Sequence, residues 1–519
     1  FFGVLNVNLH LRFLWKDYGG CRSMGDSGRD MRSRIIATIG PASDNVDTLA
    51  DMMQAGMNIA RLNYSHGDFS GKEQTIQNIR DAEKNTGMHI GLLADLPGPK
   101  LRLGRFDGEV ELLRGELVDL HCGFAEGLPP QSTTILGEMV KTLPVEWDGL
   151  SKDLQKGDPV LLSDGLIRLE VLSAPDFEGE IVRCRVEDGG ILTERKGINV
   201  PRTLVKLPAV GPHDLDCLEH ALSQNVDFVA VSYVRSADDL IPARERIEAA
   251  GVHTWIVAKI EHPAALEDLT AIVESADVVM VARGDLGVEI PLEEVPAAQE
   301  RIVSACIERG TPVVVATQML ESMVNHARPT RAEVTDVATA IRQHVSAVML
   351  SGETASGQHP IKAVETMARI AETVEQSTKG LPDPPALAAF VSTRVIAGAA
   401  IEIARETDAK HLIVGTEHGN AARLMAAHRP RIPIYAMTNR VRAARRTTIL
   451  PGVECLIVEE QTRARSTVSE AVKQLYTQKR IRPNDIIVAI SGSPLAISGR
   501  TSTIRLLFVN EEGELSDLE

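Results

Sequence analysis

The stretch IVAKIEHPAAL, residues 256–266, decides which fold this sequence predicts. Its apolar, β-branched run is typical of a strand, and the strand reaches Lys259 and Glu261 where the run ends. Residues two apart on a strand project to the same face, so we expect an ammonium and a carboxylate side by side. This pair suits a site for phosphate and metal. The alternative is a simple salt bridge at a strand end.

Two further apolar runs end in the same way. In DVVMVARGDLGVEIP, residues 277–291, the apolar run leads to Asp285. Asp285 stands near glycines, where the backbone can approach a ligand closely. In PVVVATQMLESM, residues 312–323, the apolar run ends at Thr317. Polar groups just past consecutive strands are typical of an eight-stranded α/β barrel, whose active site lies at the carboxyl ends of the strands.

The order of the expected elements extends this prediction to the whole chain. Strands alternate with amphipathic helices over 33–103 and again over 203–379, which predicts a (β/α)8 TIM barrel. Between these segments, 104–202 contains short strands and turns, and we expect a small β-barrel lid domain inserted after the third strand. A Pro-rich linker then leads to 380–519, which predicts an open α/β regulatory domain of five strands.

The two ends of the chain are expected to lie outside these domains. We interpret residues 1–32 as an N-terminal extension that is disordered or lies upstream of a true start at Met24 or Met31. A targeting peptide is the alternative. The last residues, NEEGELSDLE, are acidic and are expected to be frayed.

Composition excludes several classes of protein. The chain has 519 residues, of which 44% are hydrophobic and 24% charged, so it is long enough for several domains. A formal net charge of −16 argues against a nucleic-acid partner, and we expect no membrane span. The six cysteines form no CxxC pair and suit a reducing compartment, so we expect a cytoplasmic protein.

Several motifs together resemble the pyruvate kinase family, in its bacterial form. They are IVAKIE, MVARGDLGVE, ATQMLESM followed by RPTRAEV, MLSGETA, ATIGPAS and NIARLNYSHG, and the match runs from about residue 33 to the end of the chain. The resemblance implies phosphoryl transfer from phosphoenolpyruvate to ADP, which yields pyruvate and ATP in glycolysis. It also implies a homotetramer.

Four residues are candidates for the metal and the transferring phosphoryl group. The carboxylates of Glu261 and Asp285 are hard oxygen ligands that suit Mg²⁺ or Mn²⁺. Lys259 would stabilise charge on the phosphoryl group, and the guanidinium of Arg61 offers a fork suited to phosphate. We therefore predict that these four side chains converge at one site.

The substrate carboxylate and the proton donor involve neighbouring residues. The backbone N–H groups of Gly284 and Asp285 are expected to bind the substrate carboxylate at the first turn of a helix. The resemblance implies that Thr317 helps to deliver a proton to the enolate through water, since a hydroxyl is a poor acid. Glu353 matches another residue near this water network.

The end of the third strand departs from the family pattern. The family reads DTKGPEIR where this chain has DLPGPKLR, so Leu96 replaces a threonine and Lys100 replaces a glutamate. The resemblance implies a monovalent-cation site at Asn63, Ser65 and Asp95. An ammonium beside this site would oppose K⁺ binding, so we predict an enzyme that does not require potassium. In the alternative, Lys100 turns outward and the site still binds K⁺.

The resemblance also implies a nucleotide site, and the last domain offers an effector site. The expected nucleotide contacts are Thr38, Pro41, Asn58, Asn63, His66, Arg102, Asp164 and Lys196. The expected effector contacts are Thr416, Gly419, Asn420, Arg423, Arg500 and Thr501, in two turns whose glycine and hydroxyl groups suit an anion. Glu417 and His418 favour a monophosphate or nucleotide over a doubly phosphorylated sugar. A plain strand-to-helix turn explains the same pattern.

Two other functions are compatible with parts of the pattern. A metal-dependent lyase or aldolase would also use a Glu and an Asp on a barrel. It would need neither the lid nor Lys259. A non-catalytic sensor would keep the fold, but the intact set of Arg61, Lys259, Glu261, Asp285 and Thr317 argues against it.

Overall fold

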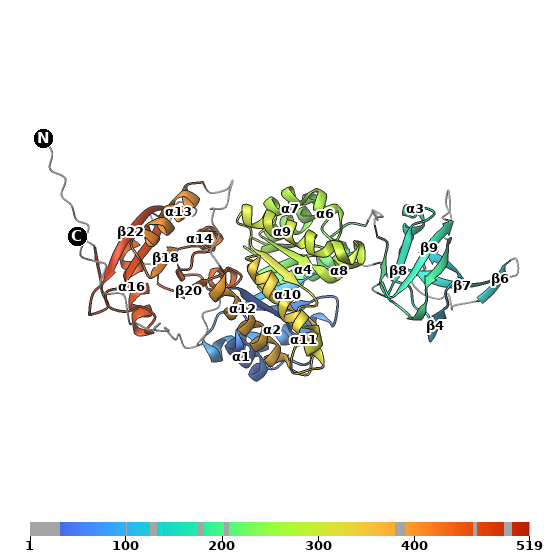
Figure 1. Cartoon of the computed structure of the whole chain (residues 1–519), viewed down its shortest axis with the longest axis horizontal. Coiled ribbons are helices and arrows are strands. Elements are labelled where there is room, and N and C mark those ends of the chain that lie inside the picture. The colour runs from blue at the N-terminus through green and yellow to red at the C-terminus, as the bar shows by residue number, and fades with distance from the viewer. Residues whose placement is uncertain are drawn as a thin grey trace.

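The computed structural model arranges the chain as three parts in a row. The C-terminal domain and the β-rich insertion lie at opposite ends of a central barrel (Figure 1). The structure describes residues 32–99, 101–124, 132–135, 138–163, 165–173, 181–201, 207–378, 391–459, 464–492 and 501–517.

Eight parallel strands close the central barrel in the order β1-β17-β16-β15-β14-β13-β3-β2. They are β1 (Arg34–Thr38), β2 (Ile59–Asn63), β3 (Gly91–Asp95), β13 (Phe228–Val231), β14 (Trp255–Ile260), β15 (Val278–Ala282), β16 (Val313–Ala316) and β17 (Ala347–Leu350). Almost all of their residues are buried, because helices cover the outer face and side chains fill the interior. The predicted (β/α)8 barrel is confirmed.

Local capping signals fix the start of some barrel helices, among them α1 and α10. Asn45 caps α1 by accepting from the backbone N–H of Thr48 at 2.9 Å, and Thr330 begins α10 with a capping box to Glu333. The helices are α1 (Val46–Ala55), α2 (Phe69–Thr86), α4 (Pro212–Ser223), α5 (Ile241–Ala249), α6 (Ala264–Glu267), α7 (Leu269–Ser275), α8 (Arg283–Glu289), α9 (Val295–Glu308), α10 (Arg331–Arg342), α11 (Gly352–Ala355) and α12 (Pro360–Ser377). Short 3₁₀ turns occupy Ala237–Leu240, Leu292–Glu294 and Glu321–Val324.

The segment inserted after β3 is rich in strands. A seven-stranded sheet has the order β12-β8-β9-β10-β5-β7-β6, and β11 pairs with β4 beside it. The elements are β4 (Glu109–Leu112), β5 (Leu117–Cys122), β6 (Ser132–Ile135), β7 (Glu138–Val145), α3 (Leu150–Asp153), β8 (Pro159–Leu162), β9 (Ile167–Ser173), β10 (Ile181–Asp188), β11 (Gly190–Thr193) and β12 (Ile198–Asn199). Alternating apolar residues of these strands form a separate hydrophobic core.

The C-terminal domain is built on a six-stranded sheet of order β20-β19-β18-β21-β22-β23. Its elements are α13 (Val391–Glu406), β18 (His411–Gly415), α14 (Asn420–Ala427), β19 (Ile434–Thr438), α15 (Val441–Thr447), β20 (Val453–Ile457), α16 (Ala464–Thr477), β21 (Ile486–Gly492), β22 (Thr501–Val509) and β23 (Leu515–Asp517). The expectation of a frayed acidic tail is wrong for Leu515–Asp517, because these residues pair with β22.

The barrel and the C-terminal domain share a hydrophobic core. One cluster joins barrel residues such as Phe228 and Trp255 to Leu412 and Val488 of the C-terminal sheet. A buried ion pair lies at the same interface, where Arg445 of α15 donates through Nε to Glu83 of α2 at 3.0 Å. The domain is therefore docked on the barrel by both apolar and charged contacts.

The Glu83–Arg445 contact predicts a pH-dependent contribution to stability. Burial alone would raise the pKa of Glu83, but hydrogen bonds from His89 and Arg445 outweigh it and lower the pKa from 4.5 to about 2. A lowered folded pKa stabilises the protein above pH 4.5, and this contribution disappears as pH falls towards 2. We expect Glu83→Gln to reduce the free energy of unfolding by roughly 3 kcal/mol at pH 7 and by much less near pH 2.5.

Urea-induced unfolding at both pH values measures this difference. Glu402→Gln serves as the control, because the Glu402 side chain is 63% exposed and should change stability by no more than about 0.5 kcal/mol. An equal loss for Glu83→Gln at both pH values would contradict the interpretation.

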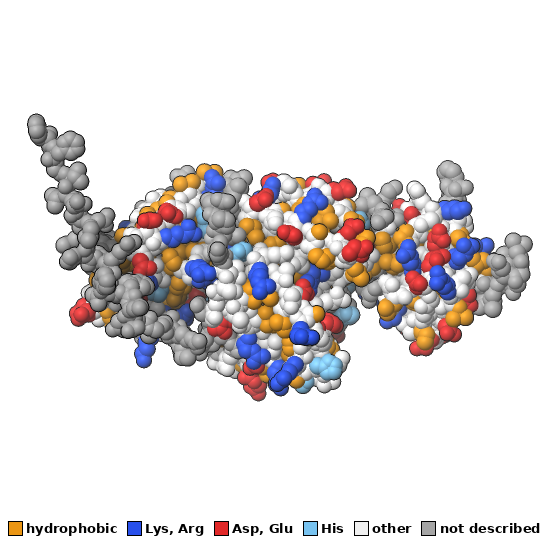
Figure 2. All heavy atoms as spheres, viewed as in Figure 1, with side chains coloured by type: hydrophobic (Ala, Val, Ile, Leu, Met, Phe, Trp, Pro, Cys, Tyr) orange, Lys and Arg blue, Asp and Glu red, His pale blue; other side chains and the backbone are white. Residues whose placement is uncertain are grey.

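Charged side chains of both signs are spread over the visible face (Figure 2), and the described helices are not those that span a membrane. Figure 2 shows Lys and Arg side chains interspersed with Asp and Glu on the visible face. Within the described ranges, no helix combines the length and apolarity that crossing a membrane requires.

Candidate active site

Lys259 lies at the centre of a cluster of polar side chains at the carboxyl ends of the barrel strands. It is the fifth residue of β14, and its Nζ lies 2.9 Å from Oε1 of Glu261 and 3.2 Å from Oδ1 of Asp95. The same Nζ donates to the hydroxyl of Ser232 at 2.8 Å. The predicted Lys259–Glu261 pair therefore forms, inside a larger cluster of charges.

Arg61 enters the cluster from the neighbouring strand β2. Its Nε donates to Oδ2 of Asp95 at 2.7 Å, and its terminal nitrogen donates to the hydroxyl of Thr38 at 2.9 Å. Asp95 ends β3 and is 1% exposed. One carboxylate thus holds the two cations Arg61 and Lys259 next to each other.

Glu261 is held from two sides just past the end of β14. One oxygen faces Lys259, and Oε2 accepts from the backbone N–H of Tyr233 at 2.7 Å. The backbone of Tyr233 has φ 53, in the left-handed region that is uncommon for a bulky residue. This turn directs the N–H of Tyr233 at Glu261.

Asp285 lies in the first turn of α8, directly after β15. The neighbouring Gly284 N–H donates to Oγ1 of Thr317 at 2.6 Å, and the Thr317 hydroxyl donates to the carbonyl of Ala316 at 2.6 Å. Gly284 is therefore within hydrogen-bond reach of the expected proton-relay residue. Its N–H can bind a substrate carboxylate only if the Thr317 hydroxyl moves aside.

A cavity of about 490 Å³ lies between the charged cluster and the inserted domain, and Gly284 and Thr317 are not among the described residues that line it. Its walls come from β2, β3, β14 and α8, from the turn that follows β13, and from the end of β11 and the segment after it. The residues that line it are Arg61, Asn63, Ser65, His66, Asp95, Leu96, Pro97, Arg102, Thr193, Glu194, Arg195, Lys196, Gly197, Ser232, Tyr233, Lys259, Glu261 and Asp285. A cavity of this size accommodates a small phosphorylated substrate.

The charges of the cluster shift the pKa values of its members. Burial disfavours charge on Lys259, but Asp95, Glu261 and Asp285 outweigh burial and raise its pKa. Burial likewise favours a neutral Asp95, yet Lys259 and Arg61 lower its pKa. Burial and the nearby Asp285 raise the pKa of Glu261 against the influence of Lys259. The site therefore keeps a permanent cation beside carboxylates that a further positive charge would stabilise.

Some predicted nucleotide contacts lie away from this cavity. Asn58 precedes β2, so it lies at the opposite end of the barrel, where its side-chain oxygen accepts from the N–H of Ile35 at 2.9 Å. The structure thus contradicts the expected nucleotide role of Asn58, because active-site groups follow strands. Thr38 is buried and orients Arg61, while Pro41 is exposed. Lys100 and Asp164 lie outside the described residues.

The expected effector turn is docked on the base of the barrel. Thr416 accepts from the N–H of Gly419 at 3.0 Å, just before α14. The guanidinium of Arg423 lies 6.0 Å from the ring centroid of Trp255, and burial lowers its pKa. Arg423 therefore packs at the interface with β14, and its contact with an effector stays a prediction. Thr501 begins β22, and Arg500 lies outside the described residues.

Ser232 arranges the cluster but was not predicted as a site residue. Ser232 accepts from Lys259 and donates to the carbonyl of Leu96 at 2.8 Å, so it fixes the amine relative to β3. Its place just past the fourth strand was the available signal. Glu353, which the resemblance had placed near the water network, accepts from the N–H groups of Leu320 and Ser351 at 3.0 and 2.7 Å, so it braces two loops.

Known proteins are similar to this chain over most of its length. The family models for the pyruvate kinase barrel domain and the pyruvate kinase alpha/beta domain match residues 30–364 and 394–507. The chain is 38% identical to a pyruvate kinase of Mycobacterium tuberculosis, over 93% of this chain and 99% of that protein. It is 37% identical to a pyruvate kinase of Geobacillus stearothermophilus, over 92% and 81%.

A solved structure gives the same result. The crystal structure of a pyruvate kinase from Cryptosporidium parvum superposes with a TM-score of 0.81 at 33% identity, over 92% of this chain and 96% of that one. Both halves of the barrel and the C-terminal domain are therefore covered by related proteins. The chain belongs to the pyruvate kinase family, whose members transfer a phosphoryl group from phosphoenolpyruvate to ADP and yield pyruvate and ATP.

Proposed function

We propose that phosphoryl transfer takes place in the cavity around Lys259, with Arg61 and Lys259 binding the transferring group. The observation that carries this assignment is the shared carboxylate of Asp95, which holds both cations at one wall of the cavity. A coupled assay that follows pyruvate formation from phosphoenolpyruvate, ADP and Mg²⁺ tests the activity. Absence of pyruvate would reject it.

Pyruvate kinases depend on a divalent metal, and we assign Glu261 and Asp285 as its ligands, with Mg²⁺ or Mn²⁺ as the ion. Among the described residues, no three His, Cys, Asp or Glu side chains are grouped as a complete metal site. Two carboxylates on one cavity wall still fit Mg²⁺, because this ion commonly binds one or two carboxylates together with water and substrate phosphates. When bound, the ion supplies positive charge for the substrate's oxygens.

The protein groups have separate tasks in this proposal. Lys259 and Arg61 neutralise the phosphoryl oxygens, and the positive charge on Lys259 is secured by the carboxylates around it. Thr317 passes a proton towards the enolate carbon through water. Lys196 and Arg102 reach the cavity from the insertion and its base, where they would contact the nucleotide phosphates, as would Asn63 and His66.

The three parts of the chain are assigned different roles. Residues 33–103 and 203–379 form the catalytic barrel, and 104–202 act as a lid that excludes water from the cavity. Residues 380–519 form the regulatory domain. We also propose a homotetramer in the cytoplasm, and the five free cysteines of the described chain suit that reducing compartment.

We propose that the enzyme does not require potassium. This proposal rests on Lys100, which stands where the family pattern has a glutamate. We expect full turnover in a sodium-free assay balanced with tetramethylammonium, because the ammonium of Lys100 would supply the positive charge that K⁺ otherwise brings. Lys100→Glu should convert the enzyme to one that potassium activates. Activation of the unmodified protein by many-fold on adding potassium would contradict this prediction.

An effector site in the turn from Gly415 to Gly419 is expected to bind a monophosphate or nucleotide. Because Gly419 of this turn packs against Trp255 at the start of β14, binding there should alter the KM for phosphoenolpyruvate. Titration of the enzyme with AMP and with sugar monophosphates measures the effect. Unchanged kinetics across the whole panel would reject the site.

A further inference from the structure

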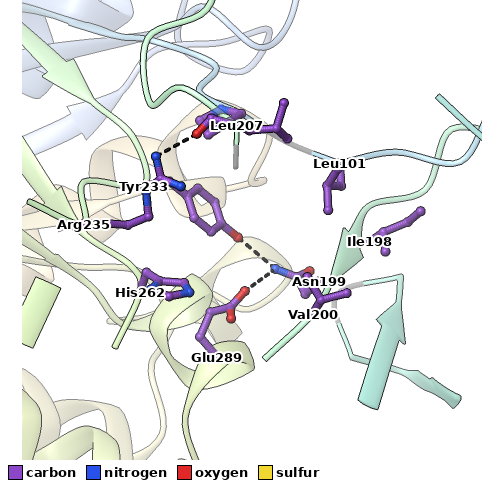
Figure 3. Close-up of a pocket in the computed structure, with 10 residues that line it drawn as sticks. Leu101, Ile198, Asn199, Val200, Leu207, Tyr233, Arg235, His262 and Glu289 are labelled. Atoms are coloured by element: carbon purple, nitrogen blue, oxygen red, sulfur yellow. Dashed lines mark hydrogen bonds between the residues drawn. The ribbon is translucent and has the colours of Figure 1, made fainter. Parts of the chain in front are cut away.

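A buried asparagine, Asn199, lies at the hinge where the inserted domain joins the barrel. It contacts two barrel segments that adjoin the assigned metal ligands. Asn199 ends β12, which pairs with β8 at the edge of the seven-stranded sheet of the insertion. Its side-chain nitrogen donates to the Tyr233 hydroxyl at 2.8 Å and to Oε1 of Glu289 at 3.0 Å (Figure 3). One amide group of the insertion thus bridges two segments of the barrel.

Each of these two segments leads to one assigned metal ligand. Tyr233 donates its backbone N–H to Glu261 at 2.7 Å. Glu289 is the last residue of α8, and Asp285 lies four residues earlier on the same helix. Asn199 is therefore one residue away from Glu261 through Tyr233, and one helical turn away from Asp285 through Glu289.

Asn199 and Glu289 are both buried, so the hydrogen bond between them is shielded from water. Asn199 is 8% exposed and Glu289 is 4% exposed, so water has little access to either group. Among the described residues, Asn199 is the one hydrogen-bond donor to the Glu289 side chain. A carboxylate only accepts, so the amide must present its nitrogen, whose two hydrogens match the two acceptors. Loss of this donor would leave a buried carboxylate unpaired.

The Tyr233 hydroxyl is the acceptor that this segment of the barrel offers to the Asn199 side chain. A phenylalanine ring would fill the same space but offer no acceptor to Asn199. The hydroxyl oxygen of Tyr233 therefore provides a hydrogen bond between the insertion and the barrel. The same residue has φ 53, and such a backbone persists only where its surroundings hold it.

We propose that Asn199 is a positioning residue that sets the two metal carboxylates from the hinge of the inserted domain. This inference rests on the proposed assignment of Glu261 and Asp285 as metal ligands. The bridge keeps the Tyr233 N–H directed at Glu261 and fixes the end of α8, so both carboxylates remain at the cavity wall. Partners that orient ligands in this way affect metal affinity strongly.

Binding of Mn²⁺ to the free enzyme, measured by electron paramagnetic resonance, tests the proposal without turnover. We expect Asn199→Ala to weaken Mn²⁺ binding about tenfold, as loss of an outer partner commonly does. Tyr233→Phe should weaken it about threefold, corresponding to one lost hydrogen bond. The double variant should resemble Asn199→Ala, because both changes break the same contact.

A kinetic measurement separates positioning from a general loss of structure. At saturating Mg²⁺, Asn199→Ala should regain most of its turnover, whereas a misfolded hinge would not respond to metal. Asn78→Ala and Tyr64→Phe are matched controls, since they remove an amide contact to Asp44 and a hydroxyl contact to His220, and neither contact involves Asn199, Glu289 or an assigned metal ligand. Both controls should bind Mn²⁺ as the unmodified enzyme does.

The outcomes distinguish this inference from the assignment on which it rests. Mn²⁺ affinity of Asn199→Ala within twofold of the unmodified enzyme, together with a large loss in Glu261→Gln, would overturn the inference alone. Normal Mn²⁺ binding by Glu261→Gln would overturn the metal assignment itself. Equal losses in Asn199→Ala and in both controls would also reject a positioning role.

Discussion

Replacing Lys259 with methionine is expected to lower kcat by at least about a hundredfold, with a much smaller change in the KM for phosphoenolpyruvate. Methionine retains the length of the side chain but removes the charge. The ammonium is kept permanently protonated by the carboxylates around it, so its electrostatic contribution grows as the phosphoryl group leaves the substrate. Steady-state kinetics with saturating ADP and Mg²⁺ measures both constants.

Lys84→Met is the matched control for this substitution. Lys84 lies on α2, 72% of its side chain is exposed, and its ion pair with Asp81 is on the surface. Surface pairs of this kind contribute little, so turnover should be unchanged. Near-normal kcat in Lys259→Met, with intact circular dichroism, would refute the role of the amine.

Replacing Glu261 with glutamine should weaken Mn²⁺ binding by at least about a hundredfold, since a direct ligand contributes more than the partners that orient it. Glutamine has nearly the same shape, and its carbonyl can still accept from the Tyr233 N–H. The negative charge is lost, however, and one neutral amide oxygen is a weaker ligand for a hard cation. Turnover should fall in parallel at low Mg²⁺ and recover in part at high Mg²⁺.

Glu308→Gln controls for the chemical change alone. This carboxylate lies at the end of α9 and is 70% exposed, so its neutralisation should leave Mn²⁺ binding unchanged. If Glu261→Gln bound Mn²⁺ as tightly as the control, the carboxylate would have to serve another purpose, such as pairing with Lys259.

The residues around Asp95 show which part of the site could be predicted from the sequence. Each barrel strand is covered on both faces, so it appears as a short apolar run, and the residue after the run is placed at the active end. This rule placed Lys259, Glu261, Asp285 and Arg61 correctly around one cavity. It also shows why Asn58 was misplaced, since that residue comes before its strand.

Other contacts depend on segments that lie far apart in the sequence. Ser232 meets Leu96 across 136 positions, and Asn199 meets Glu289 across 90. Arg423 turns towards Trp255 because the C-terminal domain docks on the base of the barrel. No local pattern of apolar and polar residues encodes such partners.

The sequence by itself determined the alternation of strands and helices, the place of the insertion, and the chemical groups that follow the strands. Burial and backbone geometry impose a period of two on strands and of 3.6 on helices, and both are visible within a few residues. Only the tertiary structure decided which carboxylate holds which cation and how Asn199 joins the insertion to the metal carboxylates. These contacts require barrel closure and domain docking, which bring together side chains that the chain separates by tens to hundreds of residues.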